Sequence, residues 1–98
     1  MAKFDLHRLH DGTLVVDCQA DLLAALETRF VVPLVPEAES WGKVRRLNPT
    51  ILVSEKPYVL LPQEAASLHR RDLGSPTGSL VEHDLAIGNA LDMLISGF

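Results

Sequence analysis

A single segment with helical apolar spacing, at the C-terminal end of the chain, restricts the fold more than any other feature. Five apolar residues recur there at helical spacing: Leu80, Ile87, Leu91, Leu94 and Ile95. Such a stripe lies along one side of a helix and must pack against another element. Ser79 and Glu82 predict a capping box at the start of this helix, and Gly97 predicts a left-handed C-cap at its end.

Short segments with alternating polar and apolar residues precede the predicted helix. Residues 3–7 and 14–18 alternate in this way, which predicts two strands, with Leu14, Val16 and Cys18 on one face. Residues 10–13 contain Asp11-Gly12, a pair that tolerates the backbone of a tight hairpin turn. Residues 21–29 favour helix by propensity but form too short a run, so either a turn or a short helix is expected.

Further strands are predicted in the middle of the chain. Residues 30–35 are rich in β-branched and aromatic types, but Pro33 lacks an N–H and is expected at an edge or a bulge. Residues 50–53 and 58–61 predict two more strands with a reversal at 54–57, and residues 69–73 predict another short strand. The expected fold class is mainly β, with at least five antiparallel strands and one C-terminal α-helix across the sheet.

Length and charge limit the organisation and the partners. The chain has 98 residues and a formal net charge of −4. No linker or repeat divides it, so a single domain over residues 1–98 is expected, with one core and little spare stability. The negative charge argues against a protein that grips nucleic acid by itself and favours protein partners or small solutes. Residues 72–98 contain no Lys or Arg and form an acidic element.

Two other observations concern the middle of the chain and its compartment. Residues 36–49 form a polar connection that contains the only tryptophan, Trp41, and a basic group at Lys43, Arg45 and Arg46. Cys18 is the only cysteine, so no intramolecular disulfide forms, which suits a reducing cytoplasm. No apolar stretch has the length of a signal peptide or a membrane span, so a cytoplasmic protein without membrane contact is expected.

Histidine and cysteine offer weak candidates for chemistry. His7 and His10 have a spacing compatible with a metal site, but no further ligands complete one, so surface histidines are expected. His69 and His83 are isolated. Cys18 becomes a nucleophile only if a neighbouring group lowers its pKa; its place on the apolar face of a strand favours an inert core thiol.

Charged residues offer two more candidate sites. Asp17 and Asp21 form a possible acid and base pair, and His69 with Arg70 and Arg71 forms a possible clamp for a phosphodiester. Acid-base chemistry requires convergent groups, which proximity in sequence does not establish, so solvated charges are the preferred interpretation. No phosphate loop, nucleophile elbow or metal motif is present. The sequence therefore predicts no catalytic residues, no metal and no cofactor.

The last residues, Ser96, Gly97 and Phe98, allow two interpretations. A helix that ends on Gly followed by an apolar residue commonly forms a Schellman cap, with the apolar side chain folded back on the last turn. The functional alternative is that Phe98, at the last position of the chain, is an apolar plug presented to a partner.

Nearly the whole chain resembles the CcdB family of bacterial toxins. Residues 14–21 and 28–34 resemble the family's Val-Asp-Val-Gln-Ser-Asp and Arg-x-Val-Ile-Pro-Leu strands. Residues 47–50, Leu-Asn-Pro-Thr, lead into a strand as in the family. Residues 84–94 match the family's Asp-Ile-x-x-Ala-Ile-x-x-Leu helix in register. The order and spacing of these blocks make the resemblance specific.

The resemblance implies a fold, partners and site residues. It implies an SH3-like small β-barrel of antiparallel strands that forms a homodimer, binds the A subunit of DNA gyrase and traps the complex with cleaved DNA without being an enzyme. A cognate antitoxin neutralises the toxin, and the pair represses its own operon, so DNA is reached only indirectly. The gyrase-binding residues implied here are Ser96, Gly97 and Phe98, where Ser96 replaces a tryptophan typical of the family.

Two alternatives stay open at this stage. Toxins resembling MazF and Kid share the SH3-like barrel but cleave messenger RNA, and fold alone does not separate the two activities. For that function His69, Arg70 and Arg71 are the residues to test. The other alternative is a non-toxic homologue that binds only the antitoxin.

Overall fold

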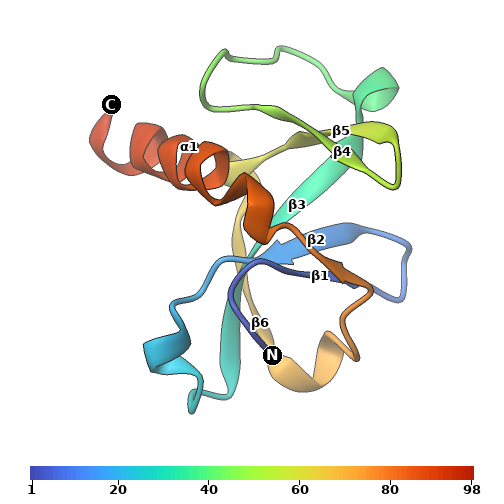
Figure 1. Cartoon of the computed structure of the whole chain (residues 1–98), viewed down its shortest axis with the longest axis vertical. Coiled ribbons are helices and arrows are strands. Elements are labelled where there is room, and N and C mark those ends of the chain that lie inside the picture. Colours follow the sequence, from blue (N-terminus) through green and yellow to red (C-terminus); the bar gives the residue numbers. More distant parts are fainter.

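The computed structural model, which describes residues 1–98, shows a strongly curled antiparallel sheet followed by one α-helix (Figure 1). The strands are β1 (Asp5–Arg8), β2 (Leu14–Asp17), β3 (Thr28–Pro36), β4 (Thr50–Val53), β5 (Lys56–Leu60), β6 (Ala66–His69) and β7 (Gly78–Ser79), and the helix is α1 (Asp84–Ser96). The strand order is β4-β5-β3-β2-β1-β7, and β6 also pairs with β3. This arrangement confirms the predicted fold class.

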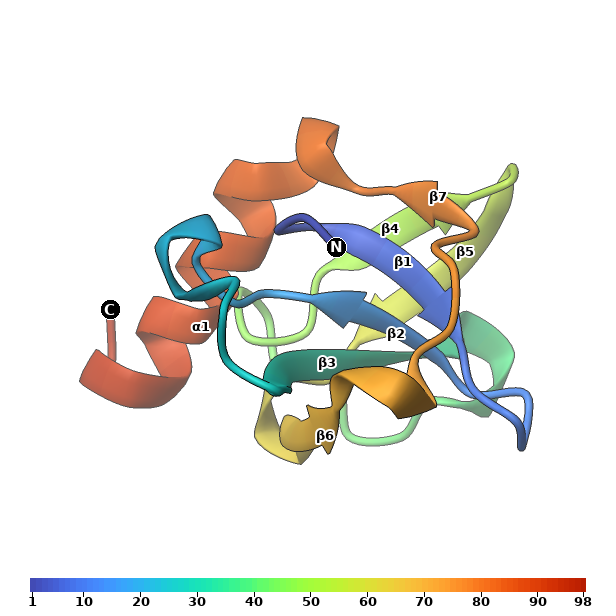
Figure 2. The same ribbon diagram turned by 90° about the horizontal axis from the view of Figure 1, so that it is seen from below.

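Strand β3 is the centre of the sheet and the cause of its curl. One of its sides pairs with β2. On the other side, residues 28–31 pair with β6 and residues 34–36 pair with β5. The neighbouring strand therefore changes halfway along β3, and the sheet divides into two wings that curl into a half-barrel (Figure 2).

Pro33 lies at the point of β3 where the neighbour changes, so its predicted place at an edge or a bulge was wrong. It is opposite Val15 of β2, and its carbonyl accepts a hydrogen bond from the Leu61 N–H at 2.9 Å. The N and C=O groups of one residue point to the same side of an extended strand, so the missing N–H faces the gap between β5 and β6. A central strand tolerates proline there because no ladder hydrogen bond is lost.

The tight turns agree with the sequence in most places. Gly12 has a φ of 90° in the turn after β1, and the Asp11 carboxylate accepts a hydrogen bond from the Thr13 N–H at 2.9 Å. Ser54 and Glu55 both have left-handed φ angles in the reversal between β4 and β5. Asp21–Leu23 forms a short 3-10 helix, which confirms the expected turn or short helix.

The strand predicted over residues 69–73 was wrong. Strand β6 covers Ala66–His69, and Arg70–Asp72 forms a 3-10 turn instead. The His69 Nδ1 atom accepts a hydrogen bond from the Arg71 N–H at 3.2 Å and so caps this turn. A side-chain cap of this kind draws the backbone away from the sheet ladder.

The predicted capping box at Ser79 and Glu82 does not form. Ser79 belongs to β7, and its Oγ accepts a hydrogen bond from the Val81 N–H at 3.2 Å. A 3-10 turn over Val81–His83 follows, and α1 begins only at Asp84. The Leu80 N–H is bonded to the Phe4 carbonyl at 2.8 Å, so pairing with the N-terminal segment delays the helix.

The helix covers the concave side of the sheet with part of its apolar stripe. Ile87 and Ala90 are buried in a core cluster that also contains Leu80, Val16 and Leu34. A second, smaller cluster on the other face of β2 and β3 contains Val15, Val31 and Leu73. Strand β2 is therefore covered on both faces, which the alternating pattern did not predict. None of the helices has the length and apolar character needed to span a bilayer.

Candidate functional site

The C-terminal end of α1 presents the residues that the sequence singled out. Gly97 has a φ of 84°, and its N–H donates to the Met93 carbonyl at 3.0 Å, which confirms the predicted C-cap. Phe98 follows this cap with 78% of its surface exposed. The Phe98 side chain therefore does not fold back on the last turn of the helix. The Schellman interpretation had predicted that it would.

Apolar residues of α1 extend the exposed surface around Phe98. Of the predicted stripe, Leu80 and Ile87 are buried and Leu91 is partly buried against the core. Leu94 and Ile95 are exposed, Ile95 by 76%. We call Leu94, Ile95 and Phe98 the tail patch. Contiguous exposed apolar residues of this kind are typical of surfaces that meet a partner.

The acidic element, residues 72–98, includes the whole of α1. Asp84 and Asp92 of α1 are exposed, and neither makes an ion pair. The Glu82 carboxylate lies 3.8 Å from His83 Nε2 and makes no ion pair with a Lys or Arg. Because residues 72–98 contain no Lys or Arg, the helix offers uncompensated negative charge to a basic partner.

A buried ion pair is the main feature that sequence reasoning missed. The Arg29 Nε atom donates to the Asp17 Oδ2 atom at 2.7 Å, and both side chains are fully buried. The Asp17 Oδ1 atom accepts a hydrogen bond from the Gln19 N–H at 3.0 Å. Asp17 is therefore not a solvated charge, and Asp21 is not its partner because Asp21 accepts from the Lys3 N–H.

His7 was wrongly expected at the surface. It is fully buried on β1, and neither ring nitrogen has a hydrogen-bond partner. His7 is buried because the second small core covers the face of the sheet that the alternating pattern assigned to solvent. His10 is exposed as expected. No group of three or more His, Cys, Asp or Glu residues is arranged to hold a metal ion.

Cys18 lies in the main core, as expected for an inert thiol. It is buried beside Val16. Burial, together with the negative charge of Asp17, raises the pKa of the Cys18 thiol to about 12. Because the thiolate is the nucleophilic form, this environment opposes reactivity.

The candidate phosphodiester clamp of His69, Arg70 and Arg71 is only partly assembled. His69 Nε2 lies 3.6 Å from the Glu27 carboxylate, and Arg70 donates to the Ala24 carbonyl at 3.5 Å. Arg71 instead lines a cavity of about 250 Å³ together with Arg8 and His10. The residues that share a cavity are therefore Arg8, His10 and Arg71, a combination that sequence spacing did not reveal.

Comparison with known structures defines the fold class first. A curled antiparallel sheet with one C-terminal helix also occurs in a structure described as an endoribonuclease from a mycobacterial species, with a TM-score of 0.77 and 12% identity over 97% of this chain and 90% of that chain. It occurs again in the Mycobacterium tuberculosis toxin MazF-mt6, with a TM-score of 0.72 and 16% identity over 95% of each chain. The fold is thus that of the small SH3-like toxins.

The family follows from the sequence match. A family model described as CcdB protein matches residues 3–97, so the chain belongs to the CcdB family. It is therefore the toxin of a toxin-antitoxin system, with an antitoxin as its partner. Among curated proteins, none matches the chain by sequence.

Proposed function

We propose that this toxin poisons DNA gyrase by binding and not by catalysis. A homodimer binds the gyrase A subunit through Ser96, Gly97 and Phe98 and traps the complex with cleaved DNA. The observation that supports this most directly is the exposure of Phe98 beyond the Gly97 cap, next to Leu94 and Ile95. A poison of this type needs a rigid scaffold that presents an apolar tail. It does not need a catalytic acid or base.

Phe98 compensates for the tryptophan that the family has at the position of Ser96. An aromatic anchor buried at an interface typically contributes on the order of 1–3 kcal/mol. Gly97 reverses the chain with a left-handed φ, so Phe98 projects from the end of the helix and stays available for such burial. We therefore expect gyrase binding with altered strength or species range and not its loss.

A homodimer suits both the target and the exposed apolar surface. Leu22, Leu23 and Leu26 are exposed around the short helix after β2, Leu22 by 92%. In Figure 1 this segment, in blue at the lower left, and the C-terminal end of α1 project from the same side of the molecule. A two-fold interface on this side brings both tails toward one edge, which fits a symmetric target.

The antitoxin contact is assigned to the acidic surface of α1. A disordered basic segment gains charge complementarity from Asp84 and Asp92, and it orders only on binding. Replacing both residues by Asn should weaken antitoxin binding. Unchanged affinity in a calorimetric titration contradicts this assignment. With the antitoxin bound, the pair is proposed to repress its own operon.

Expression in bacterial cells tests toxicity and target together. The full chain is expressed in gyrase-sensitive cells and in cells with a resistant gyrase A subunit, and growth is scored. Inhibition only in the sensitive cells supports gyrase as the target. A variant without residues 96–98 should lose inhibition while its circular dichroism spectrum stays unchanged. Purified protein that neither binds the A subunit nor stabilises cleaved DNA indicates a non-toxic homologue.

Messenger RNA cleavage is the second candidate function. The cavity lined by Arg8, His10 and Arg71 favours it because cationic groups and a histidine suit a phosphodiester. The two similar structures are described as an endoribonuclease and a MazF toxin, although their identity to this chain supports only the fold. Incubation with RNA in the absence of gyrase separates the functions. Cleavage that is lost in Arg71→Gln overturns the gyrase proposal.

A further inference from the structure

Trp41, the only tryptophan of the chain, is not used by the proposed gyrase and antitoxin contacts. It is 93% exposed. Tryptophan is among the residue types that most often anchor interfaces, because its large ring gains much from burial. The surroundings of the ring decide what kind of partner would cover it.

Trp41 lines a cavity of about 260 Å³ that combines apolar surface with negative charge. We call it the Trp41 cavity. Its apolar part comes from the half-buried residues Val35 and Leu61, and its acidic residues are Glu39 and Glu64. The other lining residues are uncharged, so no Lys, Arg or His contributes to the lining. The cavity therefore contains two carboxylates and no positive charge to balance them.

One buried amide, that of Asn48, connects two walls of the Trp41 cavity. Its Oδ1 atom accepts a hydrogen bond from the N–H of Val44, three residues beyond Trp41, at 2.9 Å. Its Nδ2 atom donates to Gln63 Oε1 at 3.0 Å, and Gln63 precedes Glu64 in a 3-10 turn. The loop that carries the ring is thus tied to the turn that carries one carboxylate. A site that is ordered in advance loses less entropy when it binds.

The two carboxylates of the Trp41 cavity have no cationic partner within the chain. Glu39 and Glu64 are exposed, and neither makes an ion pair. Lys43 is near in sequence but lies 3.8 Å from the Glu37 carboxylate. Arg8 lines another cavity with Glu39 but donates to a turn carbonyl at 2.9 Å. A cation from outside the chain can therefore bind here without displacing an existing ion pair.

These features favour an arginine side chain over the other ligands that an exposed indole binds. A nucleotide brings phosphate, which the two carboxylates repel. A purely apolar side chain leaves both carboxylates without a counter-charge. A guanidinium group stacks on an indole and donates to carboxylates from its edge, while the methylene stem packs on apolar surface. The ammonium group of lysine has no flat face for such stacking.

We propose that the Trp41 cavity is a docking site for an arginine side chain in a segment of a partner protein. The guanidinium group lies on the Trp41 ring with its N–H groups toward Glu39 and Glu64, and the arginine stem and the residue beside it cover Val35 and Leu61. The net charge of −4 favours the approach of such a basic segment. This inference does not depend on gyrase as the target or on the antitoxin contact at α1.

Fluorescence tests the proposal directly, because Trp41 is the only tryptophan. The full chain is titrated at low salt with acetyl-Leu-Arg-Leu-amide and with acetyl-Leu-Gln-Leu-amide. The arginine peptide should shift the emission to shorter wavelength in a saturable manner, because it displaces water from the ring. The glutamine peptide should bind at least about fivefold more weakly. Equal shifts with both peptides, or no shift with the arginine peptide, overturn the proposal.

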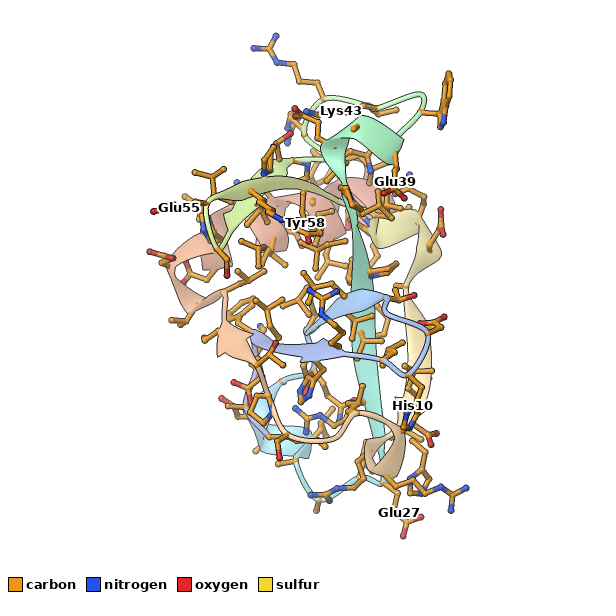
Figure 3. The ribbon with its side chains drawn as sticks, turned by 90° about the vertical axis from the view of Figure 1, so that its right-hand side faces the viewer. His10, Glu27, Glu39, Lys43, Glu55 and Tyr58 are labelled. Atoms are coloured by element: carbon orange, nitrogen blue, oxygen red, sulfur yellow. The ribbon has the colours of Figure 1, made fainter.

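Removal of the two carboxylates should weaken binding of the arginine peptide selectively. Glu39→Gln with Glu64→Gln should lower the affinity about tenfold and remove most of its salt dependence. Glu27→Gln with Glu55→Gln changes the net charge equally and should leave the affinity within about twofold of the unsubstituted chain. Glu39 and Glu27 lie toward opposite ends of the molecule (Figure 3). An equal loss of affinity in both variants overturns the proposal.

Loss of the ring should weaken the same binding. Trp41→Ala should lower the affinity about fivefold, measured by the line widths of the peptide in NMR spectra. All of the substituted side chains are exposed, so the fold should be kept in every variant. An affinity that Trp41→Ala leaves unchanged overturns the stacking of arginine on the indole. Emission that shifts with protein concentration in the absence of peptide assigns the cavity to a second copy of the chain and overturns the proposal.

Discussion

Single residues show how a protein of this size accommodates charge in its interior. Asp17 and Arg29 are placed on neighbouring strands, and their 2.7 Å contact is completely removed from solvent. The desolvation cost of such a pair is large, and the attraction between the two charges offsets it only when the geometry is good. The pair therefore contributes little net stability as a unit, but removal of either partner leaves a buried charge.

We predict opposite outcomes for single and double substitution of this pair. Arg29→Met should lower the free energy of unfolding by about 3–5 kcal/mol, because Asp17 is then buried without its partner. Asp17→Leu with Arg29→Met should recover most of this loss. Urea unfolding followed by circular dichroism measures both. Arg70→Met, at an exposed position, is the control and should change stability by less than about 0.5 kcal/mol. A double variant no more stable than Arg29→Met contradicts the prediction.

The raised pKa of the Cys18 thiol predicts how the free energy of unfolding depends on pH in the alkaline range. The pKa of its thiol is raised by burial from 9.0 to about 12 in the folded protein. Between these values the unfolded chain loses the proton and the folded chain keeps it, so stability is full below pH 9 and falls as the pH rises toward 12. The fall is at most about 1.4 kcal/mol per pH unit. Cys18→Ala should flatten the curve in this range, and an unchanged slope would refute the assignment.

At the scale of elements, α1 has a firm end and an unusual start. Its C-cap is decided by Gly97, whose φ of 84° suits glycine. Its start depends on β7, which pairs with β1 and keeps Ser79 in an extended conformation. The end of the helix is therefore set by a residue of its own sequence, and its start is set by the pairing of β7 with β1.

Two glycines of this helix should respond in opposite directions to alanine. Gly88 lies inside α1, and a Cβ atom there meets nothing within 4 Å, so Gly88→Ala should stabilise the protein by about 0.5–1 kcal/mol. Gly97→Ala should destabilise it by about 1 kcal/mol because the left-handed conformation is strained for alanine. Thermal unfolding of both variants tests the pair. Equal shifts in the same direction would contradict this account.

At the scale of the whole molecule, two segments with exposed apolar residues lie on one side. The segment after β2, which contains the exposed Leu22, and the C-terminal end of α1 project from the same side of the half-barrel (Figure 1). A small domain has limited surface to bury by itself, so in the proposed homodimer the pairing of two copies along this side would add stability that the single chain lacks.

Substitution on this side should dissociate the proposed homodimer. Leu22→Asp with Leu26→Asp places charge in an apolar interface, and sedimentation velocity should then show a monomer at concentrations where the unsubstituted chain is a dimer. Leu52→Asp, on the edge strand β4 and 61% exposed, is the matched control and should leave the dimer intact. A dimer that survives the first change, or dissociates with the second, places the interface elsewhere.

The sequence by itself determined the features that depend on neighbours in the chain. Alternation predicted the strand around residues 14–18, Asp11-Gly12 predicted a turn, and Gly97 predicted the helix end. The apolar face of the strand also placed Cys18 in the core. Each of these follows from backbone geometry and side-chain periodicity over a few residues, which distant parts of the chain do not change.

Only the tertiary structure decided which faces and charges are buried. His7 and Asp17 lie inside because a second small core covers the outer face of β2 and β3, and residues from distant segments, such as Leu73, form that core. Pro33 fits a central strand because β5 and β6 leave a gap beside it. These outcomes depend on pairing between segments far apart in the sequence, and local patterns contain no information about which segments meet.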